Sequence, residues 1–317
     1  MSSTGQYRQG SLHLEQALQH ARQSGEWAYT GAIAKDLAAN ALEQGNLQDA
    51  LAWSAQSLAD DSRYDGGEHS RVVLASHRAA VLGLSGNLGA ALVMAKQAVA
   101  VCERVVLRVE LPARQRLYVL QFELGRRALA LKGLRALRAR DDLRAPKRIE
   151  LDASLLHIGA AVDNVALLEQ VVALDDFPLR SQLLCLAQPG SDPAHILPLL
   201  ALTAATARDQ GAHGLWLTLQ TRRVAALCGA GRSAEAQEQA LAVWRRVEGG
   251  VTGIEMFPRM AADLCTALDD THADLMHVIA LRASAWMHRA AATLPSEWRQ
   301  NYLTRSPILQ ALPPRAR

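Results

Sequence analysis

Aromatic residues, lysines and patterned cysteines are scarce in this sequence. Aromatic side chains make up 4% of its 317 residues, so Leu, Ala and Val must form most of the core. Only four of the 34 basic residues are lysines, a skew typical of a GC-rich bacterial genome. The cysteines show no C-x-x-C spacing and no Cys/His pair at zinc-ligand spacing, so neither a disulfide framework nor a structural metal is indicated.

The sequence also lacks a secretory signal and a membrane-spanning segment. Residues 1–10 are polar, whereas a signal peptide needs an apolar stretch of about 7–15 residues. The longest apolar run, 196–207, contains Pro198 and is shorter than the roughly 20 residues of a membrane helix. We therefore expect a cytoplasmic protein.

Proline is absent from the first third of the chain. No proline precedes Pro112, and all eleven prolines lie from there onward. Because proline is the strongest helix breaker, the first third is free to form long helices from Ala, Leu, Gln and Arg. No alternating β-branched run that would predict a strand is present. The sequence therefore predicts an all-α protein.

Short segments of the chain repeat one another. Gly45–Ala50, Gly86–Ala91 and Gly231–Ala236 each consist of a glycine, a small polar residue, a helix start and an alanine in the sixth place. A second glycine lies 20 residues before each of them, at Gly25, Gly66 and Gly211.

The repeat predicts two antiparallel helices joined by a glycine turn. Glycine ends the first helix because the next residue commonly needs a positive φ, and the alanine lies where the two helices cross closely. Weaker copies follow Gly125, Asp163 and Pro189, and a last pair is expected to turn at 269–271. Seven such turns at intervals of about 34–45 residues predict a right-handed α-solenoid of about seven antiparallel helix pairs.

These segments resemble the tetratricopeptide repeat (TPR), in which small residues surround a Gly-Asp/Asn turn followed by alanine. The resemblance covers nearly the whole chain and is weakest at 140–200. It implies regular repeats at 25–140 and 211–294 with degenerate repeats at 141–210. Residues 1–24 are then the second helix of an incomplete first repeat, whose uncovered side predicts self-association, and 295–317 form a C-terminal capping segment.

The C-terminal segment resembles the closing part of large bacterial multidomain regulators. Leu294-Pro295 is followed by an aromatic-Arg-x-x-aromatic-Leu stretch at 298–303. In those proteins such repeats follow an NTPase module linked to a transcription activator or a nucleotide cyclase. The resemblance, with the missing first helix, implies a regulatory module cut from a longer signalling or transcription-regulating protein.

The expected function is non-catalytic binding of a protein segment in a concave groove. The register of the turn glycines points these residues into the groove: Lys35, Glu43, Ser76, Gln115, Thr218 and Thr221. The alternative is an inducer-sensing domain that binds a small molecule such as a sugar. Aromatic residues converging on the groove would favour a sugar, and an elongated charged channel would favour a peptide.

No motif for catalysis, a metal or a cofactor is present. None of the four lysines follows a glycine, which excludes a P-loop, and no H-E-x-x-H or G-x-S-x-G occurs. We therefore expect no enzyme activity, no cofactor and no metal.

One block of the chain is strongly basic. Residues 101–150 carry 13 basic and 6 acidic side chains, although the whole chain has a net charge of only +3. The candidate patch consists of Arg126, Arg127, Arg135 and Arg138. It could hold an acidic partner, such as another domain of the parent protein, or form a solvated helix face. Nucleic acid is the least favoured ligand because no aromatic side chain is interleaved.

Overall fold

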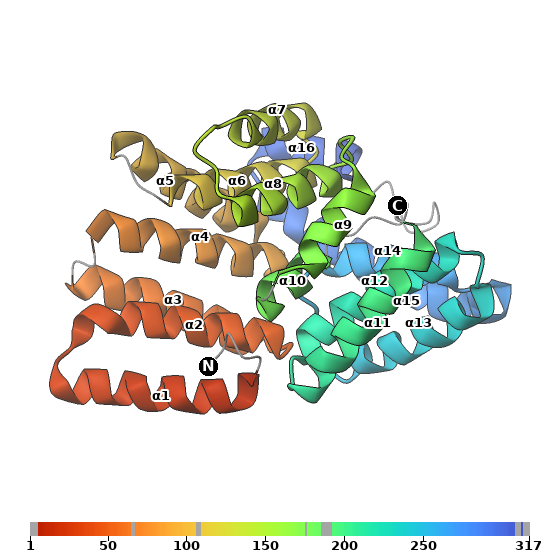
Figure 1. Cartoon of the computed structure of the whole chain (residues 1–317), viewed down its shortest axis with the longest axis horizontal. Coiled ribbons are helices and arrows are strands. Elements are labelled where there is room, and N and C mark those ends of the chain that lie inside the picture. The colour runs from red at the N-terminus through yellow and green to blue at the C-terminus, as the bar shows by residue number, and fades with distance from the viewer. Residues whose placement is uncertain are drawn as a thin grey trace.

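The computed structural model describes residues 6–64, 67–105, 109–174, 176–184, 192–307 and 312. Within these ranges every regular element is a helix and no β-strand is present, which confirms the all-α prediction. The first eight long helices form a first stack (Figure 1), with these bounds: α1 (Tyr7–Ser24), α2 (Thr30–Glu43), α3 (Leu47–Tyr64), α4 (Gly67–Ser85), α5 (Leu88–Arg104), α6 (Glu110–Glu123), α7 (Arg127–Arg138) and α8 (Ala145–His157).

Two short helices lead from this stack to a second one. They are α9 (Asn164–Val172) and α10 (Phe177–Leu184). The second stack contains α11 (Pro193–Asp209), α12 (His213–Gly229), α13 (Ser233–Glu248), α14 (Phe257–Ala267) and α15 (Ala273–Ala292). The final helix, α16 (Ser296–Arg305), returns to the first stack beside α6 and α7 (Figure 1).

The turn chemistry explains why the helices pair. Gly45, Gly86 and Gly231 have φ values of 85°, 86° and 69°, as the repeat predicts. The following asparagine caps the next helix in two of these turns: the side chain of Asn46 accepts from the Asp49 amide at 3.2 Å, and that of Asn87 from the Ala90 amide at 3.3 Å. The alanines in the sixth place are fully buried, at Ala50, Ala91 and Ala236.

Other sequence-predicted boundaries are also found in the structure. Asp192 caps α11 with Pro193 in its first turn, and Asp269 precedes α15 at the expected last turn. The Pro189–Ser191 part of the predicted turn lies outside the described residues. Among the described helices, none is both long and apolar enough to cross a bilayer.

Alternate helices of the first stack share one face. Helices α2, α4, α6 and α8 each contact the next in that series, and α3, α5 and α7 pack beside them as the second helices of the pairs. We call the face shared by α2, α4, α6 and α8 the inner face. Residues that precede the turn glycines of their pairs by about ten positions therefore lie at similar heights on neighbouring first helices.

The second stack docks against the glycine turns of the first. The Thr252 amide donates to the Gly45 carbonyl at 3.0 Å, and a Cβ on Gly45 would press on Val251. Gly86 lies against the indole of Trp286 on α15. Gly125 lies against the backbone of α16 at Asn301. Three successive turns of one stack are thus covered by three successive parts of the C-terminal region.

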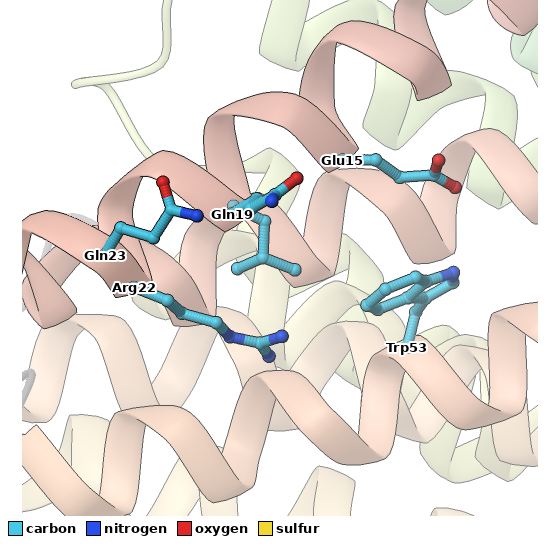
Figure 2. A pocket seen from close by; sticks show the side chains of 6 residues that line it. Glu15, Gln19, Arg22, Gln23 and Trp53 are labelled. Atoms are coloured by element: carbon cyan, nitrogen blue, oxygen red, sulfur yellow. The ribbon is translucent and has the colours of Figure 1, made fainter.

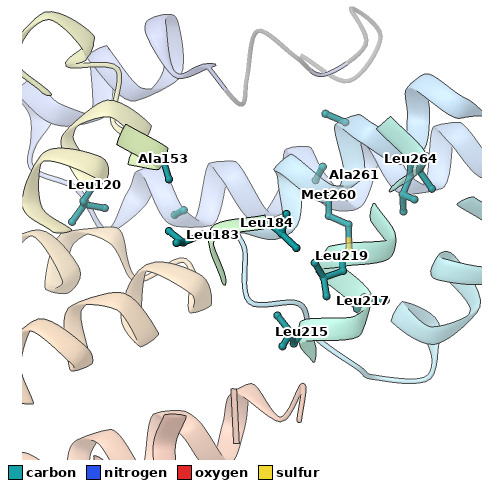
Figure 3. Close-up of a cluster of buried hydrophobic side chains, with 14 of the residues drawn as sticks. Leu120, Ala153, Leu183, Leu184, Leu215, Leu217, Leu219, Met260, Ala261 and Leu264 are labelled. Atoms are coloured by element: carbon teal, nitrogen blue, oxygen red, sulfur yellow. The ribbon is translucent and has the colours of Figure 1, made fainter. Parts of the chain in front are cut away.

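The hydrophobic core continues across this junction. One cluster contains Leu120 and Ala153 of the first stack and Leu217 and Met260 of the second, and Leu184 of α10 lies between them (Figure 3). Helix α12 is buried on nearly all sides, since α2, α10, α11, α13 and α14 contact it. The two stacks therefore share one core.

The C-terminal helix is held by its aromatic side chains. Trp298 and Tyr302 of α16 are 7% and 0% exposed. Lys96 Nζ of α5 lies 4.9 Å from the Trp298 ring centroid, and the Arg126 guanidinium carbon lies 4.8 Å from it. These contacts fix α16 against α5 and the Gly125 turn.

The close approach of the stacks predicts different results for two helical glycines. A Cβ on Gly89 of α5 would overlap the carbonyl oxygen of Thr293, whereas a Cβ on Gly83 of α4 would meet only the Met256 side chain at 3.7 Å. We expect Gly89→Ala to lower the free energy of unfolding by about 1–3 kcal/mol through overpacking. Gly83→Ala should change it little or raise it by up to about 1 kcal/mol. Urea unfolding of both variants tests this, and equal stabilities would contradict the docking of α15 on α5.

Candidate functional site

A row of titratable side chains crosses the inner face. Lys35 of α2, His77 of α4, Arg116 of α6 and Glu150 of α8 lie nine or ten residues before the turn glycines of their pairs. Neighbouring first helices pack about 8–10 Å apart, so equivalent positions form a line across them. We call these four residues the inner row.

Hydrogen bonds fix the middle of the inner row. Arg116 Nη1 donates to the Ser76 carbonyl at 2.7 Å, across the gap from α6 to α4. Gln115 Nε2 donates to Ser154 Oγ at 2.8 Å and to the Glu150 carbonyl at 3.2 Å, across the gap to α8. These bonds orient the row, yet Arg116 remains solvent-exposed.

His77 lies between two cations. Burial, and then the charges of Arg116 and Lys35, lower the pKa of His77 to about 3. The imidazole is therefore neutral near pH 7. Its Nδ1 atom is buried and makes no hydrogen bond with the described residues. Lys35 pairs with its neighbour Asp36 at 2.5 Å. The α2–α6 part of the row thus has positive charge on both sides of a neutral imidazole.

The predicted groove residues fall into two groups. Lys35 belongs to the inner row, Ser76 and Gln115 directly precede His77 and Arg116, and Glu43 is half-buried at the end of α2. Ser76, Thr218 and Thr221 are 8%, 1% and 0% exposed, so the groove prediction is wrong for all three.

For the two threonines, the physical reason for this burial is a loop of the second stack, between α13 and α14. Thr218 Oγ1 accepts from the Ile254 amide at 2.9 Å, and a Cβ on Gly253 would press on it. Both threonine hydroxyls donate to backbone carbonyls within α12. The repeat register places α12 on an open groove, but the 249–256 segment covers that face.

A buried ionic cluster joins the stacks beyond the inner row. Glu123 and His157 end α6 and α8, and Arg259 on α14 reaches both, with its Nη2 2.9 Å from Glu123 Oε1 and its Nη1 3.2 Å from His157 Nδ1. His157 Nε2 lies 2.9 Å from the same Glu123 oxygen. Because Arg259 can only donate, His157 accepts at Nδ1 and carries its proton on Nε2.

The second half of this cluster surrounds Arg222 of α12. Its guanidinium contacts Glu255 and donates to Asp263 Oδ2 at 2.6 Å. Arg222 is 7% exposed, so its charge depends on these carboxyl groups for compensation. We call the six residues of both halves the ionic cluster: Glu123, His157, Arg222, Glu255, Arg259 and Asp263.

The ionic cluster holds three carboxyl groups but two guanidinium groups. Burial would raise the pKa of Glu123, but Arg259 and the His157 hydrogen bond outweigh it and lower the pKa to about 2. Burial lowers the pKa of His157 to about 4, so this ring stays neutral. Burial, despite Arg222 and aided by Asp263, raises the pKa of Glu255 to about 7. Because the ionic cluster has one more carboxyl group than it has guanidinium groups, Glu255 takes up a proton.

Most side chains of the predicted basic patch make contacts within the chain. Arg126 lies on Trp298 and 3.4 Å from Glu297. Arg127 donates to the Gly159 carbonyl at 2.9 Å, and Arg138 makes two bonds to Asp152, at 2.6 and 3.0 Å. Arg135 is exposed and has no ion pair with the described residues. Three of the four predicted residues thus have intramolecular roles.

A hollow of about 300 Å³ lies between α1 and α3. Figure 2 shows Trp53 on one side of it and Glu15, Gln19, Arg22 and Gln23 on the other. The guanidinium of Arg22 lies 3.4 Å from Asp60, which is 2% exposed. This hollow is on the side of the second helices, away from the inner row.

Among the described residues, no group of three or more His, Cys, Asp and Glu side chains could hold a metal ion. A comparison of the chain with protein-family models finds no match, and a comparison with curated proteins finds none. The inner row and the ionic cluster therefore supply the functional argument.

The ionic cluster predicts opposite pH effects for two of its members. Between about pH 4.5 and 6.5 the unfolded chain protonates His157 and the folded chain does not, so this group makes stability rise with pH. Glu255 is protonated only in the folded chain over that range, so it makes stability fall as pH rises. His77 acts in the same direction as His157, and Asp263, whose pKa is raised by burial, acts with Glu255.

Removing either His157 or Glu255 should reveal the effect of the other on the pH dependence of stability. Relative to wild type, Glu255→Gln should gain stability as pH rises from about 5 to 6.5, by about 1 kcal/mol per pH unit, and His157→Gln should lose it at a similar rate. Chemical denaturation at several pH values gives the two differences. Profiles that run parallel to wild type would show that these groups titrate normally in the folded chain.

Proposed function

We propose that this chain is a non-catalytic interaction module that binds an acidic protein segment along its inner face. The inner row is the observation that carries the proposal. Lys35, His77 and Arg116 present cationic or donor groups at one height on three successive helices, and Arg116 remains exposed. An extended segment lying across these helices would meet them in turn.

The charge of the row sets the chemistry of the segment. An anionic group near His77 would offset the two positive charges that flank the neutral ring, and would accept from Arg116. Glu150 gives the α8 end of the row the opposite sign, although Lys147 contacts it. The preferred segment therefore carries carboxylates where it crosses α2–α6.

We also propose the finer architecture and context that the repeats suggest. The glycine turns, the asparagine caps and the alternation of first and second helices support a TPR-like right-handed superhelix of about seven pairs. The resemblance of the closing helix supports a place in a bacterial signalling or transcription-regulating protein. In such a protein the acidic segment could belong to a partner or to another domain of the parent chain.

A sugar-sensing role is the second candidate, and the hollow beside Trp53 favours it. One aromatic face with glutamine, glutamate and arginine side chains is a suitable lining for a small polyhydroxylated ligand. The inner row, by contrast, is elongated and charged. A neutral oligosaccharide that shifts the Trp53 indole resonance and leaves His77 unchanged would support this second role.

The peptide proposal is tested by the titration of His77. The probe is an extended 12-residue peptide rich in Asp and Pro, with a Lys/Pro peptide of equal length as control. We expect the acidic peptide to raise the pKa of His77 from about 3, because bound carboxylates favour the imidazolium. NMR of the labelled imidazole reports the change.

The variants Lys35→Gln and Arg116→Gln together should weaken binding of the acidic peptide about tenfold, since two charge-assisted contacts are lost. Arg245→Gln, which removes an exposed arginine on α13, is the matched control and should have no effect. An acidic peptide that binds no better than the basic one, or that binds without moving the His77 titration, would contradict the proposal.

A further inference from the structure

A hollow of about 720 Å³ lies between α1 and the start of α2, which are neighbours at one end of the first stack (Figure 1). Its apolar lining consists of Ala17 and Ala21 of α1 with Tyr29, directly before α2, and Ile33. Tyr29 is 62% exposed, and no other aromatic side chain that the structure describes is exposed. The hollow therefore presents an aromatic ring to solvent in a chain that buries or half-buries the rest.

The hollow and Lys35 flank one open face of α2. Ile33 lines the hollow together with α1, whereas the charge of Lys35 acts on His77 of α4. Successive residues of a helix are rotated by about 100°, which places Ala32 and Asp36 between Ile33 and Lys35. Ala32 is exposed and the Asp36 side chain is 44% exposed, so this face is open to solvent. Because Ile33 and Lys35 differ in height by only about 3 Å, the hollow continues the line of the inner row beyond α2.

Acidic side chains at the hollow determine which part of a bound segment can lie there. Glu26 lines the hollow, and Asp36 pairs with Lys35 and offsets its charge on the open face of α2. A carboxylate placed in the hollow would be repelled by Glu26, whereas Arg116 attracts it farther along the inner row. The hollow therefore suits an uncharged, apolar side chain, and the carboxylates of the segment belong over α4 and α6.

We propose that this hollow is the apolar end of the inner-face site, and that it binds one large apolar side chain of the acidic segment. The inference rests on the proposed function, because the same segment supplies the carboxylates to the inner row. Neighbouring first helices lie about 8–10 Å apart, so the hollow is roughly 12–25 Å from α4 and α6. An extended chain covers that distance with about four to eight residues. The partner is therefore an acidic segment with an apolar residue about four to eight positions from its carboxylates.

The test uses the full chain and two labelled probes, measured by fluorescence anisotropy. Both are 12-residue peptides rich in Asp and Pro; one has leucine at both ends and the other has serine, so the direction of the bound chain does not matter. We expect the leucine-ended peptide to bind about tenfold more tightly, since burying much of one leucine side chain contributes about that factor. This advantage should persist between about 50 and 200 mM salt, because it is apolar, while the affinity of both peptides falls.

Variants separate the apolar end of the site from the charged row. Tyr29→Ser should remove most of the leucine advantage and leave binding of the serine-ended peptide unchanged, whereas Tyr29→Leu should keep most of the advantage. Leu202→Ser removes a leucine of α11 that is 69% exposed; it is the matched control and should change neither affinity. Lys35→Gln with Arg116→Gln should weaken both peptides about tenfold, since both lose the same charge-assisted contacts.

Circular dichroism of each variant checks that the helices are retained. Equal affinities for the two peptides, with the serine-ended one still raising the pKa of His77, would overturn this inference and leave the proposed function standing. If neither peptide binds, both fail. A leucine advantage that survives Tyr29→Ser would place the apolar contact elsewhere and overturn the inference. A chain that sediments as a dimer, and as a monomer after Tyr29→Ser, would assign the hollow to a second copy and would also overturn it.

Discussion

Direct contact between the backbones of the two stacks is the constraint on which this fold depends. Glycine at 45 allows the loop at 251–252 to approach so closely that Thr252 donates two hydrogen bonds to the Gly45 carbonyl, from its amide at 3.0 Å and its hydroxyl at 2.9 Å. Gly214 of α12 lies against the same turn, where a Cβ would overlap the Leu42 carbonyl. A turn glycine therefore does two things: it ends α2 with a positive φ, and it leaves room for the second stack.

The ionic cluster forms because the second stack docks against the turns of the first. Glu123 and His157 lie at the ends of α6 and α8, where an open array would expose them to water, and Arg259 of α14 meets them there. Breaking one partner of a buried charge pair leaves an uncompensated charge, so the cluster selects one docking arrangement more than it adds to total stability. The inner row lies about two turns from these ends, and its Arg116 stays exposed.

The pattern of turns could be predicted from the sequence, and so could their local chemistry. The glycines, the asparagine caps and the buried alanines all depend on neighbouring residues, which is why Gly45–Ala50 and Gly86–Ala91 are sufficient to predict them. The register also placed Ser76 and Gln115 one residue away from His77 and Arg116. A search for titratable residues at equivalent positions of successive first helices would have found His77 and Arg116.

Long-range docking could not be predicted in this way. Thr218 occupies the position of a groove residue in its own repeat, yet the segment that covers it follows α13 and has no counterpart in the other repeats. Likewise, the sequence shows that 126–148 is basic, but only the contacts with Asp152, Glu297 and Gly159 show which cations are used internally. Contacts between different helices, from 14 to 171 residues apart in the sequence, leave no local pattern.

Amide hydrogen exchange at the junction tests the two-stack account most directly. The Thr252 amide, bonded to Gly45, and the Gly89 amide, bonded to Thr293 Oγ1 at 3.0 Å, both lie between the stacks. If the stacks share one core, these amides exchange only when the whole molecule unfolds, with the same opening free energy as the central residues of α12. Rapid exchange at Thr252 and Gly89, with α2 and α12 still protected, would show that the stacks separate freely and would contradict the account.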